Sequence, residues 1–463
     1  MVAGNERRAA MTSSPFRVFL MTTLGLAGSL AFAFAGERQL THAAHGHVLT
    51  NVNVWSPDAQ WIVYDVRTVD SIFDGKRIEE VNVTTGETRV LFEAKNGASC
   101  GVATYHPLEP KVVFIHGPER PTLDWSYGPS RRRGAMVDTR SPGRITPLDA
   151  MNYAPPFVPG ALRGGSHVHV FSPDGAMISA TYEDEVLARL GHTADETGRD
   201  LNQRTVEAMF LLPSGEGVRV ARAHPRNHDG NYFSVVVART VNRPRPGSDE
   251  IGRAYEEGWV VGSKRERALA FLGNVVALDG REWAEVFLAE LPSDLTLAGD
   301  GPLEGTSTRR PAPPRGVVQR RLTFTSERKF PGVVTAPRHW LRASADGSRI
   351  AFLMKDDNGV VQLFTVAPTG GSFRQVTQNP SGIESAFTWS PDGRSIAHTM
   401  DGRVCVTEME SGKTQMLTET TRHPLLPLAC VFSPDGRQIA FMRQVADEVG
   451  SFSQIFTVDV PTP

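Results

Sequence analysis

Histidine supplies the first candidates for chemistry in this chain. The sequence has 463 residues and 13 histidines, and two of them, His167 and His169, are one residue apart in SHVHVFSPDG (166–175). Side chains two positions apart on a β-strand lie on the same face, so this pair could point two imidazoles in one direction. Imidazole binds transition metals and serves as a general acid or base near neutral pH. The pair therefore marks a candidate site.

The pair belongs to a phrase that recurs along the chain. Each copy predicts a short strand, a tight turn around Pro, Asp and Gly, and a second strand, because Asp and Gly accept the backbone angles of tight turns. A second phrase with two more strands follows each copy, as in 361–377 and 404–418. Four antiparallel strands in about 40 residues correspond to one propeller blade. The first phrase occurs at 54–66, 170–182, 388–400 and 431–443, with looser copies at 105–117 and 343–355.

The repeat predicts an all-β fold, a single β-propeller over residues 37–463. Blades start near residues 51, 101, 167, 338, 385 and 428, and a distorted seventh lies between about 222 and 325, with 231–240 as its first strand. Seven blades are favoured, and eight or six are the alternatives. Two insertions interrupt the pattern: 184–206, expected to be partly helical, and 243–268, with a short helix expected at 251–259.

The last copy indicates how the ring closes. It ends with SQIFTVDV (453–460) and lacks a fourth strand, whereas a strand with the same Leu-Thr ending, ERQLTH (37–42), stands near the other end of the chain. Pairing these two segments would remove two open sheet edges. We therefore expect the N-terminal strand to complete the last blade.

The repeat also predicts which side chains face the central channel. The first strand of each blade lines the channel, and residues five and seven positions before the turn Asp are expected to share its inner face. We count five and seven residues back from the turn Asp of each blade, which is Asp174 in the third blade and Asp229 in the distorted one. The residues selected in this way form a histidine-rich wall of the channel. Its members are Asn51, Asn53, His167, His169, Arg222, His224 and His339.

Three kinds of channel fit this set. His167, His169, His224 and His339 could hold Mn, Zn or Fe, with Glu119 or Glu183 as an outer carboxylate or base. The same side chains could form a polar ligand-binding channel without metal, in which Arg222, Asn51 and Asn53 contact an anionic ligand. The third alternative is a channel that is only structural.

The motifs also resemble known families. The Ser-Pro-Asp-Gly hairpins and Leu-Thr blade ends resemble the WD40-like repeats of TolB-type propellers. Segments outside the repeat, among them LRGGSHVHVFSPDG (162–175) and RPGSDEIGRAYEEGW (245–259), resemble an uncharacterised bacterial propeller family, a domain of unknown function. YHPLEPKVVFIHGPE (105–119) is similar to a segment of oligogalacturonate lyases, which are propellers with a histidine-bound manganese ion. That similarity implies a metal but carries over no catalytic residue.

Composition and the N-terminal segment limit the partners and the cellular location that we expect. The formal net charge is -2, which argues against nucleic acid as a partner, and three cysteines form no disulfide framework or zinc motif. Residues 1–36 contain arginines followed by an apolar run that ends in Ala33-Phe34-Ala35, the pattern of a signal peptide. We expect a periplasmic or secreted protein without a membrane span after removal of the leader. Translation from Met21 would instead give a cytoplasmic protein.

These observations favour a binding or interaction propeller with a polar channel, whose ligand is a protein, a peptide or a glycan. The alternative is a metal-dependent lyase or hydrolase that acts on an acidic oligosaccharide. The sequence leaves open whether the protein is an enzyme.

Overall fold

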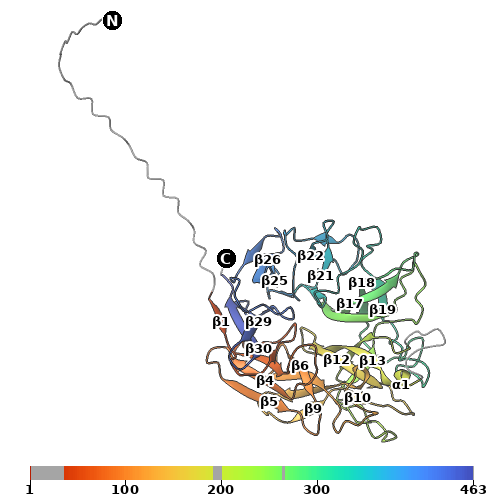
Figure 1. Ribbon diagram of the computed structural model, residues 1–463. Coiled ribbons are helices and arrows are strands. Elements are labelled where there is room, and N and C mark those ends of the chain that lie inside the picture. Colours follow the sequence, from red (N-terminus) through yellow and green to blue (C-terminus); the bar gives the residue numbers. More distant parts are fainter. Residues whose placement is uncertain (2–35, 191–200, 263–265, 462–463) are drawn as a thin grey trace. The chain divides into compact units, whose positions relative to one another are not determined.

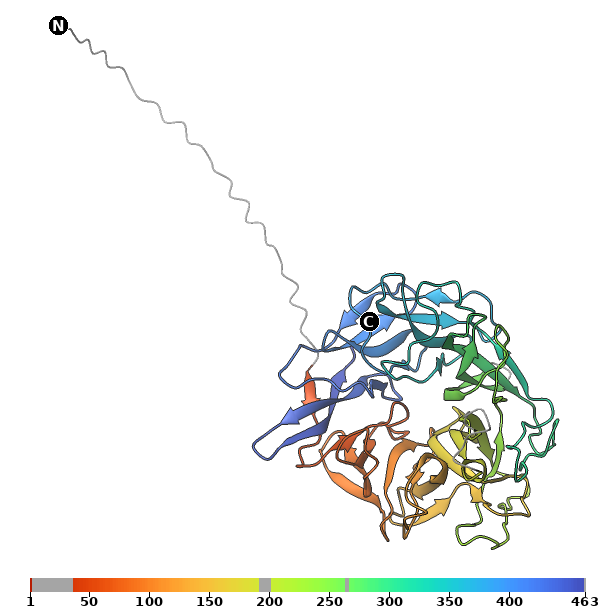
Figure 2. The same ribbon diagram turned by 45° about the vertical axis from the view of Figure 1, so that its right-hand side comes forward.

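The computed structural model describes residue 1 and residues 36–190, 201–262 and 266–461 (Figure 1). The apolar run of the predicted leader and parts of both predicted insertions lie outside these ranges. The described residues from 36 onward form one compact unit. Its β-strands form seven four-stranded antiparallel sheets arranged as a ring (Figure 2), which confirms the predicted seven-bladed propeller.

Blades 1 to 3 follow one another along the chain, and the strands of each blade run in chain order from the innermost to the outermost. Blade 1 contains β2 (His47–Val48), β3 (Trp61–Val66), β4 (Arg77–Asn82) and β5 (Thr88–Glu93). Blade 2 contains β6 (Cys100–Tyr105), β7 (Lys111–His116), β8 (Arg133–Asp138) and β9 (Ile145–Pro147), with the short helix η1 (Pro129–Arg131) before β8. Blade 3 contains β12 (Gly164–Phe171), β13 (Met177–Asp184), β14 (Thr205–Phe210) and β15 (Phe233–Val236), with α1 (Glu185–Ala188) after β13. The connection between blades 2 and 3 holds the parallel pair β10 (Ala150–Met151) and β11 (Ala161–Leu162).

Blades 4 to 7 have the same order of strands. Blade 4 contains β16 (Ala254–Val261), β17 (Arg267–Val276), β18 (Glu282–Leu291) and β19 (Val318–Arg321). Blade 5 contains β20 (Arg342–Ala343), β21 (Ile350–Lys355), β22 (Val361–Val366) and β23 (Arg374–Gln375). Blade 6 contains β24 (Thr388–Trp389), β25 (Ser395–Met400), β26 (Arg403–Glu408) and β27 (Thr414–Met416). Blade 7 contains β28 (Val431–Phe432), β29 (Gln438–Ala446), β30 (Ser451–Asp459) and β1 (Glu37–Gln39).

Antiparallel pairing gives the ring two different sides. The turns between the first and second strands of every blade, which include the Ser-Pro-Asp-Gly turns, lie on one side, here called the hairpin side. The connections between the second and third strands lie on the opposite side, here called the loop side. The first strands therefore begin at the loop side and end at the hairpin side.

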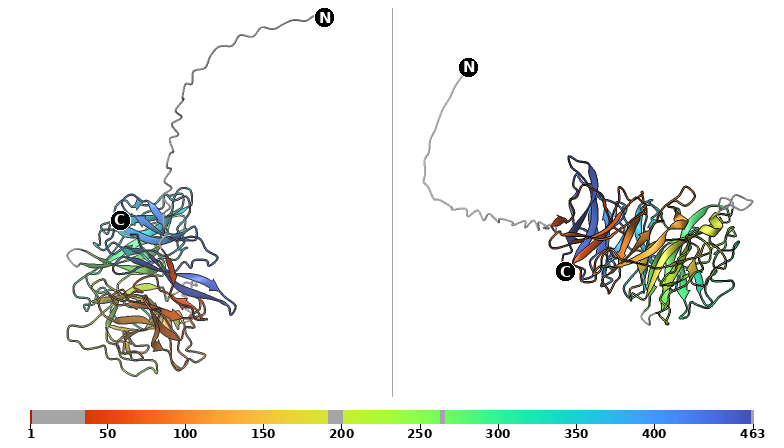
Figure 3. Two further views of the ribbon diagram at one scale, coloured as in Figure 1. Left: turned by 90° about the vertical axis from the view of Figure 1, so that its left-hand side faces the viewer. Right: turned by 90° about the horizontal axis from the view of Figure 1, so that it is seen from below.

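The N-terminal strand closes the ring as predicted. β1 pairs with β30 in antiparallel register, with Glu37 opposite Val458 and Gln39 opposite Phe456. In Figures 1 and 3 the red β1 lies beside the blue strands of blade 7. The buried guanidinium of Arg443 donates to both carboxylate oxygens of Glu37 at 2.7 and 2.9 Å, which fixes β1 to the blade by an ion pair as well as by backbone hydrogen bonds.

Blade 4 differs from the prediction. Its first strand is β16, which overlaps the segment 251–259 that was expected to contain a helix, and the predicted first strand at 231–240 is instead the outer edge of blade 3, as β15. The apolar run of β15 resembles a buried inner strand, whereas β16 carries two glutamates and no Ser-Pro-Asp turn follows it. The prediction therefore assigned the wrong innermost strand to this blade, because it relied on apolar content.

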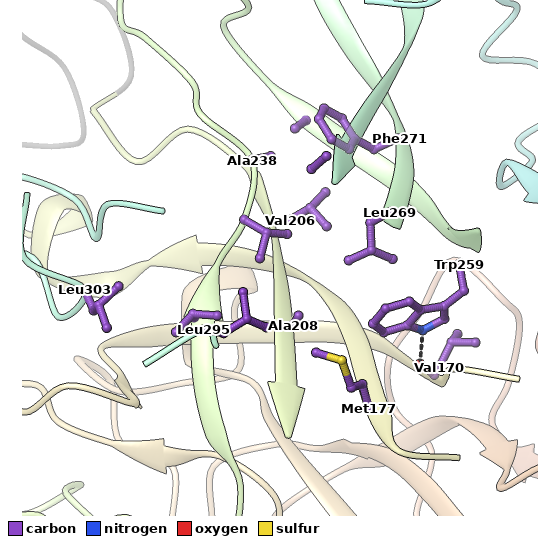
Figure 4. Close-up of a cluster of buried hydrophobic side chains, with 14 of the residues drawn as sticks. Val170, Met177, Val206, Ala208, Ala238, Trp259, Leu269, Phe271, Leu295 and Leu303 are labelled. Atoms are coloured by element: carbon purple, nitrogen blue, oxygen red, sulfur yellow. Dashed lines mark hydrogen bonds between the residues drawn. The ribbon is translucent and has the colours of Figure 1, made fainter. Parts of the chain in front are cut away.

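The cores lie between neighbouring blades. The cluster between blades 3 and 4 contains Val206 and Ala208 from β14 and Leu269 and Phe271 from β17, all buried (Figure 4). Trp259 of β16 packs into the same cluster and donates its indole N–H to the carbonyl of Val170 at 2.9 Å. Burial of each large apolar side chain contributes about 1.5–3 kcal/mol, so these contacts hold adjacent blades together.

Candidate functional site

A β-bulge separates the two histidines of blade 3. The register of β12 against β13 shifts between His167 and Val170, and Val168 has a φ of 59°. A bulge reverses the alternation of side chains, so positions two apart no longer share a face. His167 and His169 therefore point in different directions, although the sequence pattern predicted a common one.

His169 lies in the interface between blades 2 and 3. A Cβ atom placed on Gly134 of β8 would be 2.8 Å from its Nε2, so the ring packs directly on that strand. Nε2 is 2.9 Å from the Ser166 hydroxyl, which donates to Asp149 at 2.7 Å. Burial lowers the pKa of His169 to about 3, so the ring is neutral. This polar chain joins two blades.

The other two predicted histidine ligands also lie apart from His167. His339 accepts a hydrogen bond from the backbone N–H of Leu353 at 3.2 Å and donates to the Pro337 carbonyl at 3.1 Å. His224 is not on a first strand but in residues 211–232, between β14 and β15, where its ring lies 5.3 Å from that of Trp125. The turn at Asp229 was therefore the wrong reference for blade 4.

The predicted metal ligands do not come together. No group of three or more His, Cys, Asp or Glu side chains could hold a metal ion within the ranges that the structure describes. His339 uses both ring nitrogens in hydrogen bonds within the protein, and His169 uses its Nε2, whereas its buried Nδ1 has no partner among the described residues. The set His167, His169, His224 and His339 therefore does not fit a histidine-bound metal.

The remaining predicted residues divide between several places. Arg222 is on the surface and pairs with Asp229 at 3.1 Å. Glu119 is half-exposed, 3.6 Å from Arg133. Asn53 has a φ of 51°, and its carbonyl accepts a hydrogen bond from the N–H of Tyr105 at 2.6 Å. Glu183 lies at the loop-side end of the channel and belongs to the cluster described next, and Asn51 contacts Arg342 of that cluster.

Arginines surround His167 at the loop-side end of the channel. Burial lowers its pKa well below the usual value, and the charges of Arg132, Arg338 and Arg204 lower it further. Arg204 donates to Glu183 at 2.8 and 2.5 Å, and Arg132 is 3.9 Å from the same carboxylate. These side chains come from three places: Arg132 and Arg204 from the connections before β8 and β14, and Arg338 from the segment before β20.

Glu256 from blade 4 and Arg338 from the segment before blade 5 form another part of this cluster. Arg338 donates to both oxygens of Glu256 at 2.8 and 3.2 Å, and its guanidinium lies 4.5 Å from the centre of the Trp340 ring. Glu256 has a φ of 54°, because β16 contains a bulge at the same place as β12. The bulge therefore directs this carboxylate to Arg338.

Arg342 crosses the channel. Its guanidinium donates to the side-chain oxygen of Asn51, which belongs to blade 1, although Arg342 is in blade 5. Its Nε is buried and finds no hydrogen-bond partner among the described residues, and the same holds for Nδ1 of His167. Burial lowers the pKa of Arg342 to about 10. We define the arginine cluster as the set Arg132, His167, Glu183, Arg204, Glu256, Arg338 and Arg342.

Glu257 lies beside the arginine cluster but points into the interface of blades 3 and 4. Its carboxyl accepts a hydrogen bond from the Thr181 hydroxyl at 2.9 Å, and its other oxygen has no partner among the residues described. Burial raises its pKa to about 7. The charge near Arg342 thus changes within the neutral pH range.

The sequence pattern identified only two members of the arginine cluster, His167 and Glu183. The arginines were missed because they lie in connections outside the repeat, where no period places them. One signal was available: the basic run RRR at 131–133 contains Arg132, which is 7% exposed. A basic run that is buried has to be paired or bind an anion.

The hairpin-side end of the channel is different. A cavity of about 220 Å³ is lined by the turns and first strands of blades 1, 2, 6 and 7. Trp55 and Trp389 donate their indole N–H groups to carbonyls of blades 7 and 5, both at 2.9 Å, so their rings are fixed. The cavity is lined mainly by aromatic rings and prolines, among them Trp55, Pro57, Tyr105, Trp389, Pro391 and Phe432.

The fold and this channel define a seven-bladed β-propeller with WD40-like repeats. An oligogalacturonate lyase in complex with manganese has a TM-score of 0.54 at 12% identity, over 93% of this chain and 94% of the lyase. Oligogalacturonate lyase from Vibrio parahaemolyticus has a TM-score of 0.53 at 11% identity, over 93% and 95%. These similarities concern the fold alone. In the described ranges we find no helix long and apolar enough to cross a membrane.

The chain belongs to the family of the uncharacterized protein YidR of Escherichia coli (strain K12). The two are 46% identical over 421 residues, which are 90% of this chain and 97% of that protein. A family model described as protein of unknown function (DUF3748) matches residues 99–228. The matched range includes His167, Arg132 and Arg204. The predicted membership in an uncharacterised bacterial propeller family is thus confirmed.

Proposed function

We propose that the protein binds a carboxylate-bearing ligand at the loop-side end of its channel, in contact with the arginine cluster. The observation that carries this proposal is the unpartnered, buried Nε of Arg342 beside Asn51. A buried donor without a partner is costly, and an anionic acceptor satisfies it. A ligand oxygen would therefore gain a strong hydrogen bond there.

The charge of the cluster supports an anionic ligand. It contains four guanidinium groups, from Arg132, Arg204, Arg338 and Arg342, and two carboxylates, from Glu183 and Glu256. His167 is neutral, because burial lowers its pKa and the guanidinium groups around it further disfavour a positive charge. Arg132 and Arg342 are buried, so their charges attract an anion more strongly than surface arginines would.

This function belongs to the binding class, with an acidic oligosaccharide or an acidic peptide as the ligand. The alternative, a metal-dependent lyase or hydrolase, required a histidine-bound metal, and the histidines do not supply that ligand set. We therefore assign the cluster to recognition through hydrogen bonds and charge.

Calorimetric titration tests the proposal. Oligogalacturonate is a suitable probe because every sugar carries a carboxylate, and a neutral oligosaccharide of the same length is its control. We expect Arg338→Gln to weaken binding of the acidic probe about tenfold, as loss of a charged contact does. Arg394→Gln, on the hairpin side with a side chain 83% exposed, should leave binding unchanged.

Two results would contradict the proposal. One is equal binding of the acidic and neutral probes, because recognition would then not depend on the carboxylate. The other is equal affinity of the Arg338→Gln and Arg394→Gln variants, which would place the binding site outside the arginine cluster.

A further inference from the structure

The loop side of the ring carries exposed apolar side chains at the tips of its connections. Five blades, 7, 1, 2, 3 and 4 in order around the ring, each have at least one in the connection between their second and third strands. On the hairpin side, the described connections carry three, Leu108, Leu211 and Leu297, one each in blades 2, 3 and 4. The loop-side group consists of Val69, Ile72, Leu123, Tyr127, Leu190, Leu278 and Val449.

Leu123 is the most exposed of them, at 106% of its reference area. It lies at the tip of a four-residue turn that is closed by backbone hydrogen bonds between Thr122 and Trp125, at 3.1 and 3.3 Å. The Thr122 hydroxyl donates to Asp124 at 2.7 Å. The turn therefore holds the leucine rigidly in water, an arrangement that costs free energy unless something covers it.

Arginines fix the base of this turn. Trp125 is buried, and the guanidinium groups of Arg131, Arg189 and Arg226 lie 5.0, 4.8 and 5.7 Å from its ring centre. Arg226 also donates to the carbonyls of Glu119 and Arg120, at 2.6 and 3.0 Å. These contacts join the connection 117–132 of blade 2 to the long connection 211–232 of blade 3.

The surroundings of Leu123 are positively charged. Four guanidinium groups face three carboxylates, and one of these carboxylates, Glu185, already pairs with both Arg131 and Arg189. The arginines are Arg120, Arg131, Arg189 and Arg226, and the acids are Glu119, Asp124 and Glu185. This local excess of positive charge contrasts with the net charge of -2 of the whole chain.

We infer that the loop side docks on an anionic lipid bilayer, with Leu123 inserted among the acyl chains and the surrounding arginines in the headgroup layer. Separate aliphatic tips ringed by cations fit a bilayer, which accepts each tip on its own. A protein partner would need a continuous apolar patch instead. This docking goes beyond the proposed ligand binding and does not depend on it.

Vesicle flotation with the full chain tests the docking. The probes are phosphatidylcholine vesicles with and without phosphatidylglycerol. We expect binding to the vesicles that contain phosphatidylglycerol, and a loss of about tenfold in Leu123→Asp. Leu108→Asp is the matched control, because Leu108 is 66% exposed in a turn on the hairpin side and should bind like the unmodified protein.

A charge variant separates the two contributions. Arg120→Glu should weaken binding to the anionic vesicles about fivefold or more, because each basic residue near such a surface contributes about 1 kcal/mol. Its effect should disappear at high salt, where surface charges are screened. The effect of Leu123→Asp should persist there.

Three outcomes overturn the inference. The unmodified protein fails to float with either vesicle, or Leu123→Asp and Leu108→Asp bind equally. The third is self-association in sedimentation equilibrium that Leu123→Asp abolishes while no vesicle is bound, which would assign the surface to a second copy of the chain. Arg338→Gln should bind the carboxylate probe about tenfold more weakly but keep vesicle binding, so failure of one proposal is distinguishable from failure of the other.

Discussion

The two ends of the channel are built from different parts of the sequence. The hairpin-side end consists of repeat residues, such as Trp55, Trp389 and Phe432, whose rings and indole N–H groups connect one blade to the next. The loop-side end consists of charged residues from connections that the repeat does not include, such as Arg204 and Arg338. The repeat therefore specifies how blades attach to one another, and the connections specify what the channel binds.

The largest expected effect concerns the hairpin-side end. Replacement of Trp55 by Ala should lower the free energy of unfolding by about 3–5 kcal/mol, because it leaves a cavity and an unpaired carbonyl at Val431. Urea unfolding followed by far-UV circular dichroism measures this change. A loss below about 1 kcal/mol would mean that the indole does not connect blades 1 and 7.

A second effect follows from the pKa of Glu257, which burial raises from 4.5 to about 7. The folded protein keeps a proton that the unfolded chain loses above pH 4.5, so the free energy of unfolding should fall as the pH rises from about 4.5 to 7. The decrease is on the order of 3 kcal/mol, and full stability is retained below that range.

Glu257→Gln isolates this contribution. The amide does not titrate, so the decrease between pH 4.5 and 7 should be smaller in the variant by that amount. Asp149, whose pKa burial raises to about 6, acts in the same direction and remains in both proteins, which is why the difference between the two slopes is measured. Identical slopes would show that Glu257 is ionised throughout.

The smallest effect on stability is expected at the loop-side end. Arg338→Gln should change the free energy of unfolding by less than about 1 kcal/mol, because the Arg338 side chain is 44% exposed and the glutamine amide can still donate a hydrogen bond to the buried Glu256 carboxylate. The same urea titration measures it. If Arg338→Gln destabilised the protein as much as Trp55→Ala, the division between a structural end and a binding end would be wrong.

Most of the fold could be predicted from the sequence. Turns with Asp174 or Asp392 have a recognisable composition because their backbone angles demand it, and the missing fourth strand after 453–460 could be matched only with 37–42. Blade 4 was misassigned because β16 has no such turn and is less apolar than the outer strand β15. Local composition therefore shows where the strands lie in the sequence, but it does not show which strand of a blade is the innermost.

Less of the candidate site could be predicted. His167 was predicted as a site residue from its position in the repeat, and the structure places it in the arginine cluster. His169 was placed with it because alternation holds on a regular strand, and the bulge at Val168 breaks that alternation without a mark in the sequence. Arg204 and Arg338 come close to His167 only through the closed ring, a long-range property that no local pattern contains.

The pairing of β1 with β30 also affects how the chain is made. The strand that completes the last blade is near the start of the sequence, and its partners, β29 and β30, are near the end. During synthesis β1 must therefore remain unpaired until almost the whole chain has left the ribosome, and six sheets can form before the seventh. A chain that stalls late would expose the open edges of blades 1 and 7 at once, the kind of surface that aggregates or recruits chaperones.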